Sequence, residues 1–290
     1  MKKTVGERVF TVFNYTFLIL LSVMMVFPLW EVLKISLSSS AEVGSLDYYF
    51  WPERIDWTAY KQCFGNEMVW IGYKNTLIRI VYALLIQMTL TIFTAYALSH
   101  RKLPNKLFWT LVVIVTKFVS GGLIPTYLVV RSLGLLNTNM SLVLPTAINV
   151  FYLLIVRNFF LGIPVELEEA ASIDGAGIYR VFFTIILPLS KAILMTLAMW
   201  IVVGNWNAWF DCLMYIQSQE KFVLQTVLRK IIIDASPQMQ DVYTVASDIK
   251  PNAEVVKCAT IIVSSLPILA VYPFVQKYFV KGTMVGAVKG

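Results

Sequence analysis

The sequence predicts an all-α protein that crosses a membrane with six helices, because its composition is strongly apolar and the apolar residues gather in long runs. Hydrophobic residues make up 58% of the 290 residues and charged residues only 14%, and the mean hydropathy is +0.71. Soluble globular chains average about 45–50% apolar and about 25% charged residues. Too few charges are present to cover a water-facing surface, so a soluble enzyme, a disordered chain and a DNA-binding domain are excluded.

The apolar runs define the six predicted spans, since a helix needs about 20 residues to cross a bilayer. They are residues 10–33, 75–98, 107–130, 140–160, 185–210 and 257–279. Each run must be helical because lipid cannot hydrogen-bond an open backbone. The first run is too long for a signal peptide and is interpreted as a retained span. No internal repeat is visible, so one membrane domain over residues 1–290 is expected.

Charge predicts the orientation of the spans. The segments on one side hold 11 basic and 5 acidic residues, and those on the other side hold 9 basic and 11 acidic residues. By the positive-inside rule the first side is cytoplasmic, and both termini then lie inside. Loop 34–74 on the outer side is rich in Trp and Tyr. This pattern favours an interfacial aromatic belt, and a docking surface for an extracytoplasmic partner is the alternative.

Metal binding and histidine chemistry are not expected. The three cysteines (Cys63, Cys212 and Cys258) have no metal-ligand spacing, and His100 is the one histidine. The sequence also lacks the His-Glu-x-x-His and Gly-x-Ser-x-Gly patterns of membrane-embedded hydrolases.

The loop at residues 162–188 predicts a helix-turn-helix on the cytoplasmic face. Pro164 suits the first turn of a helix, and the acidic residues that follow it favour the positive end of the helix dipole. Gly175 follows Asp174 and can adopt the left-handed conformation that closes a helix. An ordinary interfacial loop would not account for the spacing of the whole string. That string is Glu169-Ala170-Ala171, three residues, Gly175, nine residues, then Ile185-x-Leu187-Pro188.

This string resembles the EAA loop of ABC importer permeases. Other stretches are similar to the carbohydrate-uptake branch of that family: Ser120–Tyr127, Leu133-Gly-Leu-Leu, Leu144-Pro145, Asn205-Trp-Asn-Ala-Trp209 and the tail Lys281–Gly290. The tail resembles the second permease subunit of the maltose type, and the whole chain resembles the polysaccharide and oligosaccharide subgroup. The resemblance implies the type I ABC importer permease fold and a bacterial plasma-membrane location.

The resemblance also implies a division of labour. A second permease subunit completes the pore, two ATPase subunits bind ATP and Mg, and an extracytoplasmic binding protein delivers an oligosaccharide. The EAA helix docks in a cleft of the ATPase, so this chain itself needs no cofactor. The residues implied in coupling are Glu169, Ala170, Ala171, Asp174, Gly175 and Gly177. Glu169 would pair with a basic residue, the alanines would pack into the cleft, and Gly175 would make the turn.

The role of the C-terminal tail has two interpretations. No stretch of the chain supplies the Walker pattern, so the chain is not expected to bind ATP. A flexible basic tail is one reading of Gly286, Lys289 and Gly290. The reading implied by the family is insertion of these residues between the ATPase subunits.

Polar residues within spans are candidates for the substrate pathway. The strongest group is Asn205, Trp206, Asn207, Trp209 and Asp211, since amides bind hydroxyl groups and aromatic rings stack on sugar faces. Hydrogen bonding between helices and an outer aromatic belt explain the group equally well, and in the maltose-type family the partner subunit makes most substrate contacts.

Two basic residues lie inside predicted spans. Lys117 falls near the middle of the third span and should face a wet cavity or a partner, since a central lysine costs about 2.5–3.5 kcal/mol. It would offset the charge of an acidic oligosaccharide or pair with the second permease subunit. Arg79 is expected to snorkel to the outer interface. Gly121 and Gly122 are expected to allow close helix packing.

The alternatives to an oligosaccharide importer are an ABC permease for a non-sugar solute and a stand-alone secondary transporter. A secondary transporter usually shows paired halves or ionisable residues at the midplane, and neither is found in this sequence.

Overall fold

The computed structural model describes residues 4–43, 50–234 and 254–270, and no strand occurs in these ranges. The predicted all-α fold class is confirmed. The chain divides into two compact units, one of Met1–Glu67 with Leu228–Leu266 and one of Met68–Val227 with Pro267–Gly290. Each unit is described by itself.

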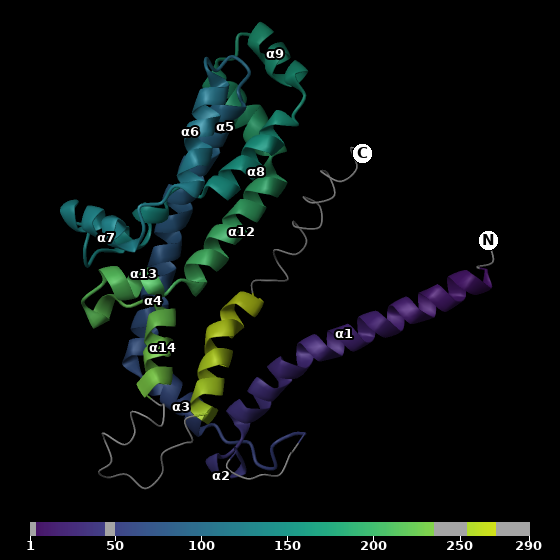
Figure 1. The fold of residues 1–290 in the computed structure, drawn as a ribbon, viewed down its shortest axis with the longest axis vertical. Coiled ribbons are helices and arrows are strands. Elements are labelled where there is room, and N and C mark those ends of the chain that lie inside the picture. The colour runs from purple at the N-terminus through teal and green to yellow at the C-terminus, as the bar shows by residue number, and fades with distance from the viewer. Residues whose placement is uncertain (1–3, 44–49, 235–253, 271–290) are drawn as a thin grey trace. The chain divides into compact units, whose positions relative to one another are not determined.

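The first unit is dominated by the long helix α1 (Val5–Leu37), which Figure 1 shows in purple. Thr4 and Glu7 close its N-terminus with a capping box, in which the Thr4 N–H donates to the Glu7 carboxylate at 2.8 Å. Along α1 only residues at its C-terminal end are buried within the chain. A long apolar helix that is exposed over most of its length is the form expected of a span whose partners are lipid or another subunit.

Other segments of the first unit pack at the C-terminal end of α1 and make polar contacts there. α2 (Ser40–Val43) follows it, and α3 (Thr58–Gly65) packs against it. The Ser36 and Tyr60 hydroxyls lie 2.8 Å apart, and Cys63 Sγ lies 3.6 Å from Thr260 Oγ1. Thr260 belongs to the helical segment 254–270. The first unit therefore joins three segments that are distant in sequence.

The second unit contains the remaining helices. They are α4 (Glu67–Ala83), the π-helix η1 (Leu84–Met88), α5 (Thr89–Ser99), α6 (Lys106–Phe118), α7 (Leu123–Ser132), the 3₁₀ turns η2 (Asn139–Leu142) and η3 (Leu144–Thr146), α8 (Val150–Leu161), α9 (Val165–Ile173), α10 (Ile178–Val181), the π-helix η4 (Phe182–Ile186), α11 (Leu187–Leu189), α12 (Lys191–Asn207), α13 (Phe210–Tyr215), η5 (Gln219–Lys221) and α14 (Leu224–Asp234). The unit boundaries fall after Glu67 in α4, after Val227 in α14 and after Leu266 in the helical segment 254–270, so most of α14 belongs to the first unit.

The core of the second unit lies where α5, α8, η4 and α12 meet. α5 packs most extensively on α8. Fully buried side chains from all four elements form one cluster that includes Ala95, Leu153, Phe182 and Leu197. Small residues on α5 let the backbones approach closely, which is the usual way that membrane helices pack.

Among the residues that the structure describes, two helical stretches are long and apolar enough to cross a membrane alone, Val5–Leu37 and Glu67–Ser99. The number rises to at most five if each bent pair of helices is one span. The predicted third, fourth and fifth spans are not straight helices. The two halves of each are bent by 110°, 56° and 79°, respectively. Periodicity cannot reveal such bends, because the apolar run continues through them.

The bend in the third predicted span corrects the expectation for Gly121 and Gly122. Helix α6 ends at Phe118 and α7 begins after Gly122, which has φ +84°. A Cβ at Gly121 would lie 3.3 Å from the Cβ of Pro125. A left-handed φ is incompatible with a continuing α-helix, so the glycines break the helix instead of letting two helices approach.

Candidate functional site

The predicted coupling segment folds as the sequence indicates. Helix α9 begins after Pro164 and ends in a Schellman motif around Gly175, which has φ +80°. The Ala176 N–H donates to the Ala171 carbonyl at 2.9 Å, and the Gly175 N–H donates to the Ser172 carbonyl at 3.1 Å. These two bonds satisfy carbonyls that the helix end would otherwise leave without partners.

Helix α9 presents its surface outward. It contains no buried residue, and Glu169, Ala170 and Asp174 are all exposed. Ile173 is 87% exposed, although it is a large apolar residue outside the apolar spans. Ala171 instead packs against the core of the second unit. The two alanines therefore face different surfaces, and α9 exposes apolar area that a partner would cover.

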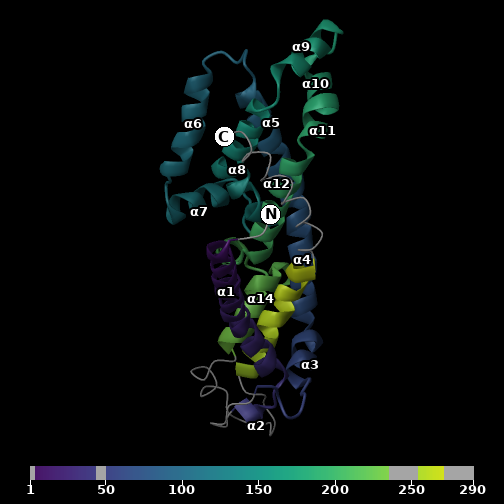
Figure 2. The ribbon, with the colours of Figure 1, turned by 90° about the vertical axis from the view of Figure 1, so that its right-hand side faces the viewer.

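Contacts within the second unit hold α9 in place. His100, the residue after α5, lies with Nδ1 3.8 Å from a carboxylate oxygen of Glu168 on α9. Gly177 has an extended backbone with φ −70° and leads into α10. Figures 1 and 2 show α9 beyond one end of the α5, α8 and α12 bundle, with α4 extending away from its other end.

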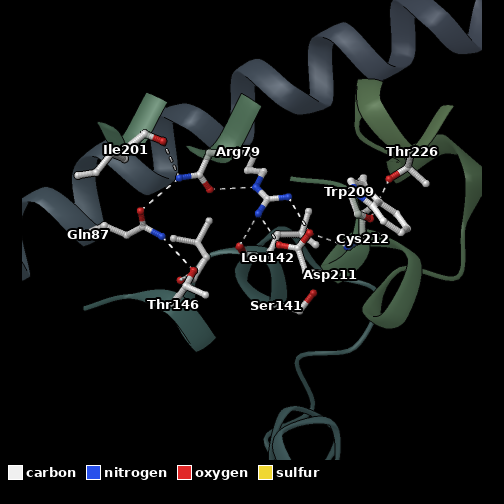
Figure 3. Close-up of polar contacts among 12 residues, drawn as sticks. Arg79, Gln87, Ser141, Leu142, Thr146, Ile201, Trp209, Asp211, Cys212 and Thr226 are labelled. Atoms are coloured by element: carbon white, nitrogen blue, oxygen red, sulfur yellow. Dashed lines mark hydrogen bonds and ion pairs between the residues drawn. The ribbon is translucent and has the colours of Figure 1, made fainter. Parts of the chain in front are cut away.

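A buried ion pair lies near the opposite end of α12. The Arg79 side chain is only 3% exposed, and its guanidinium pairs with the Asp211 carboxylate. Nη1 donates to Asp211 Oδ1 at 3.0 Å, Nε donates to Asn205 Oδ1 at 3.0 Å, and Nη2 donates to the Leu142 carbonyl at 3.2 Å (Figure 3). The expectation that Arg79 snorkels is wrong. Asp211 neutralises it, so it stays inside the protein.

The network continues along side-chain amides. Asn205 Nδ2 donates to Gln87 Oε1 at 3.2 Å and to the Ile201 carbonyl at 2.9 Å. Gln87 Nε2 donates to Thr146 Oγ1 at 3.1 Å, as Figure 3 shows. Gln87 belongs to η1, and π-helices inside α-helices often mark functional positions. The network therefore ties together α4, η1, η3, α12 and α13.

This network forms one wall of a cavity of about 420 Å³, within the range of about 300–1,000 Å³ that is typical of small-molecule sites. The other lining residues are Asn149, Tyr152, Trp200, Ile201, Gly204, Asn207, Ala208, Trp209 and Phe210. The cavity thus combines amides, aromatic rings and a neutralised charge pair.

The structure separates the predicted substrate residues. Asn205, Asn207, Trp209 and Asp211 line the cavity. Trp206 is instead buried, with its ring 6.1 Å from that of Tyr73. Asn205, Trp206 and Asn207 are successive residues of α12. Because an α-helix has 3.6 residues per turn, neighbouring side chains point about 100° apart, and Trp206 faces other surroundings than Asn205 and Asn207.

Lys117 lies outside this cavity. It is exposed in the last turn of α6, where a cation is stabilised by the helix dipole. It therefore lies at a helix end and not, as expected, in the middle of a straight span, because the span breaks directly after it.

The cavity also contains residues that the sequence did not single out. Gln87 could have been found, since it is a polar residue inside an apolar span. Tyr152 and Trp200 carried no such signal, because aromatic residues are common in membrane helices. The tail residues Gly286, Lys289 and Gly290 lie outside the described residues. Within the ranges that the structure describes, no cluster of three His, Cys, Asp or Glu side chains could hold a metal ion.

Comparisons with known proteins decide the family. No family model matches the chain. It is 37% identical over 287 residues to the polygalacturonan/rhamnogalacturonan transport system permease protein YtcP of Bacillus subtilis, covering 98% of this chain and 99% of that protein. It is 39% identical over 290 residues to Protein LplC of the same species, covering 100% and 98%. The chain belongs to the carbohydrate-uptake ABC transporter permeases.

A solved structure gives the same result. The bacterial ABC transporter involved in the import of the acidic polysaccharide alginate contains a chain with a TM-score of 0.85 and 29% identity, which covers 96% of this permease and 99% of that chain. The ABC importer permease fold is thereby confirmed. As a permease this chain is a non-catalytic, cofactor-free subunit of a multi-pass membrane complex, and ATP is hydrolysed on separate ATPase subunits.

Proposed function

We propose that this permease forms half of the translocation pathway for an oligosaccharide and couples it to ATP hydrolysis through α9. Membership of the carbohydrate-uptake family supports the substrate class. The exposure of α9 supports the coupling role, since a short polar helix that leaves Ile173 exposed is suited to a protein partner. Both termini would lie in the cytoplasm, on the side of α9, and the C-terminal tail would contact the ATPase pair.

The attachment to the ATPase would rest mainly on packing. An exposed ion pair made by Glu169 with a basic residue contributes only about 0–1 kcal/mol. Ala170 and Ile173 add apolar area, and Gly175 fixes the direction in which the chain leaves the helix. The coupling is then the difference in docking free energy between the inward-facing and outward-facing states.

Substitution of Gly175 tests the coupling role. In Gly175→Ala a side chain must adopt φ +80°, which costs roughly 1–2 kcal/mol. We expect weaker retention of the ATPase during purification and less sugar imported per ATP hydrolysed. Gly134→Ala is the matched control, because Gly134 has φ +66° and open space around it but lies away from α9. Equal ATPase retention by the two variants would contradict the proposal.

The finer proposal is that the oligosaccharide is acidic. The alginate importer is named for an acidic polysaccharide, and Lys117 is an exposed cation at the break between α6 and α7. We expect Lys117→Met to lower uptake of oligogalacturonides and to leave uptake of maltodextrins unchanged. Equal losses for both sugars would show that Lys117 is structural, for example paired with the second permease subunit.

A further inference from the structure

Most polar groups in the network wall of the cavity are already hydrogen-bonded to other protein groups. Both N–H groups of the Asn205 amide have acceptors, its oxygen accepts from Arg79, and the Gln87 amide is bonded at both ends. Asp211 balances the charge of Arg79. Groups that are already paired gain little from a ligand. The network therefore shapes the wall, and binding must depend on other lining residues.

Two of the other lining residues carry aromatic rings that stack on each other. Tyr152 of α8 and Trp200 of α12 stack with their centroids 5.2 Å apart and their planes at 22°. Both side chains are half-buried, and both line the cavity. Neither the Tyr152 hydroxyl nor the Trp200 indole N–H has a hydrogen-bond partner among the described residues. Neither atom is among the buried groups that lack a partner, so both stay accessible. A ring that combines an apolar face with an accessible polar group suits a ligand that carries hydroxyls.

Two amides flank the rings with spare hydrogen-bonding capacity. Asn149 uses its oxygen to cap α8, at 3.0 Å from the Phe151 N–H, which leaves its two N–H groups. Asn207 is exposed and donates once, to the Val203 carbonyl at 3.0 Å. Its oxygen and its second N–H have no partner in the part of the chain that the structure describes.

We propose that Tyr152 and Trp200 form the platform of a saccharide-ring subsite inside this permease, with Asn149 and Asn207 as ligands for sugar hydroxyls. This inference rests on the proposed function and adds a location and a mode of recognition. The apolar face of a pyranose ring packs on an aromatic face, and its equatorial hydroxyls reach the amides. Arg79 and Asp211 act as positioning residues, because they fix Asn205 and the wall without offering a net charge.

The subsite therefore does not select for acidity. The only ion pair that lines the cavity, among the residues that the structure describes, is already internally neutralised. Neutral and acidic sugars should depend on Trp200 equally, whereas a dependence on Lys117 should differ between them. Comparing the effects of Trp200 and Lys117 variants on neutral and acidic sugars therefore tests the aromatic subsite independently of the role proposed for Lys117.

The test is import by the whole complex. Digests of pectin, alginate and starch are supplied to cells that express the complete importer, and the imported oligosaccharides are identified by mass spectrometry. The importer is then reconstituted in proteoliposomes, and the imported sugar is measured per ATP hydrolysed. The ratio is measured at saturating sugar and binding protein, because the binding protein that delivers the sugar dominates the apparent KM.

We expect Trp200→Leu to lower the sugar imported per ATP about tenfold, the factor equivalent to about 1.4 kcal/mol for a lost aromatic contact. Trp200→Phe should recover most of the import. Trp109→Leu is the control, because Trp109 is a 49% exposed tryptophan on α6 away from the cavity. If Trp200→Leu does not assemble, Asn207→Ala decides, with an expected loss of about threefold, or about 0.7 kcal/mol.

The outcomes are distinct. Unchanged import per ATP in Trp200→Leu or, where that variant does not assemble, in Asn207→Ala would overturn the subsite while leaving the proposed function intact. Equal loss of import and of ATP hydrolysis, with no recovery in Trp200→Phe, would assign the rings to helix packing and also overturn it. If deletion of the permease leaves uptake of every oligosaccharide unchanged, the proposed function itself fails.

Discussion

Loss of Asp211 should destabilise the protein more than loss of Arg79, although the two residues form one ion pair. The Arg79 side chain is 3% exposed, and that of Asp211 is 24% exposed. Asp211→Leu would leave a buried guanidinium whose remaining partners are Asn205 Oδ1 and the Leu142 carbonyl. Removing one partner of a buried pair destabilises by about 3–5 kcal/mol.

Arg79→Met should be milder. It leaves a carboxylate that still reaches water and accepts from its own neighbour, the Cys212 N–H at 2.9 Å. We expect about 2–3 kcal/mol, mostly from the acceptors that lose the guanidinium. In the double variant Arg79→Met/Asp211→Leu no charge remains buried, and replacing a whole pair by apolar residues is often close to neutral. The double variant should therefore be more stable than Asp211→Leu alone.

The assay is the apparent melting temperature of the purified complex in nanodiscs, followed by tryptophan fluorescence. For a chain of this size 1 kcal/mol corresponds to about 2–4 °C, so Asp211→Leu should melt about 10 °C below the wild type. Lys102→Met serves as the control, since Lys102 is exposed and an exposed substitution is expected to stay within about 0.5 kcal/mol. The reasoning is refuted if the double variant melts no higher than Asp211→Leu, or if Arg79→Met melts lowest.

Two further predictions concern packing and burial in the same complex. Gly72→Ala should destabilise by about 1–3 kcal/mol, because a Cβ there would lie 2.9 Å from the Leu224 Cα, whereas Gly204→Ala, with nothing within 4 Å, should not lower the melting temperature. Burial raises the pKa of the Cys63 and Cys212 thiols. Since the thiolate is the reactive form, maleimide labelling of both should be slower than that of free cysteine at pH 7 and should still accelerate above pH 9. Fast labelling at pH 7 in the intact complex would contradict the burial of these thiols.

Some features of this permease follow from local sequence alone. The turn at Gly175 was predicted from its neighbours because a helix stop depends on backbone conformation within one turn, and the structure confirms it with φ +80°. The apolar runs likewise predicted the helical class. The break before α7 was missed at Gly122, although glycine in a left-handed conformation is also a local feature. Hydropathy averages over such a break and hides it.

The cavity could be predicted only in part. Asn205, Asn207 and Asp211 stood out because polar residues in a span need partners. Their actual partners could not be found, since Arg79 and Asp211 are 132 positions apart in the chain.

Local sequence was enough to predict a helical membrane protein with an acidic-alanine helix closed by glycine, because composition, span length and helix caps depend on residues within a few turns of one another. The permease family was indicated by the resemblance of the loop at residues 162–188. The packing of the fold, in contrast, places Arg79 in a buried ion pair, turns Trp206 away from the cavity and stacks Tyr152 on Trp200 beside it. These outcomes depend on which helices meet and at what rotation, and packing between distant segments sets both.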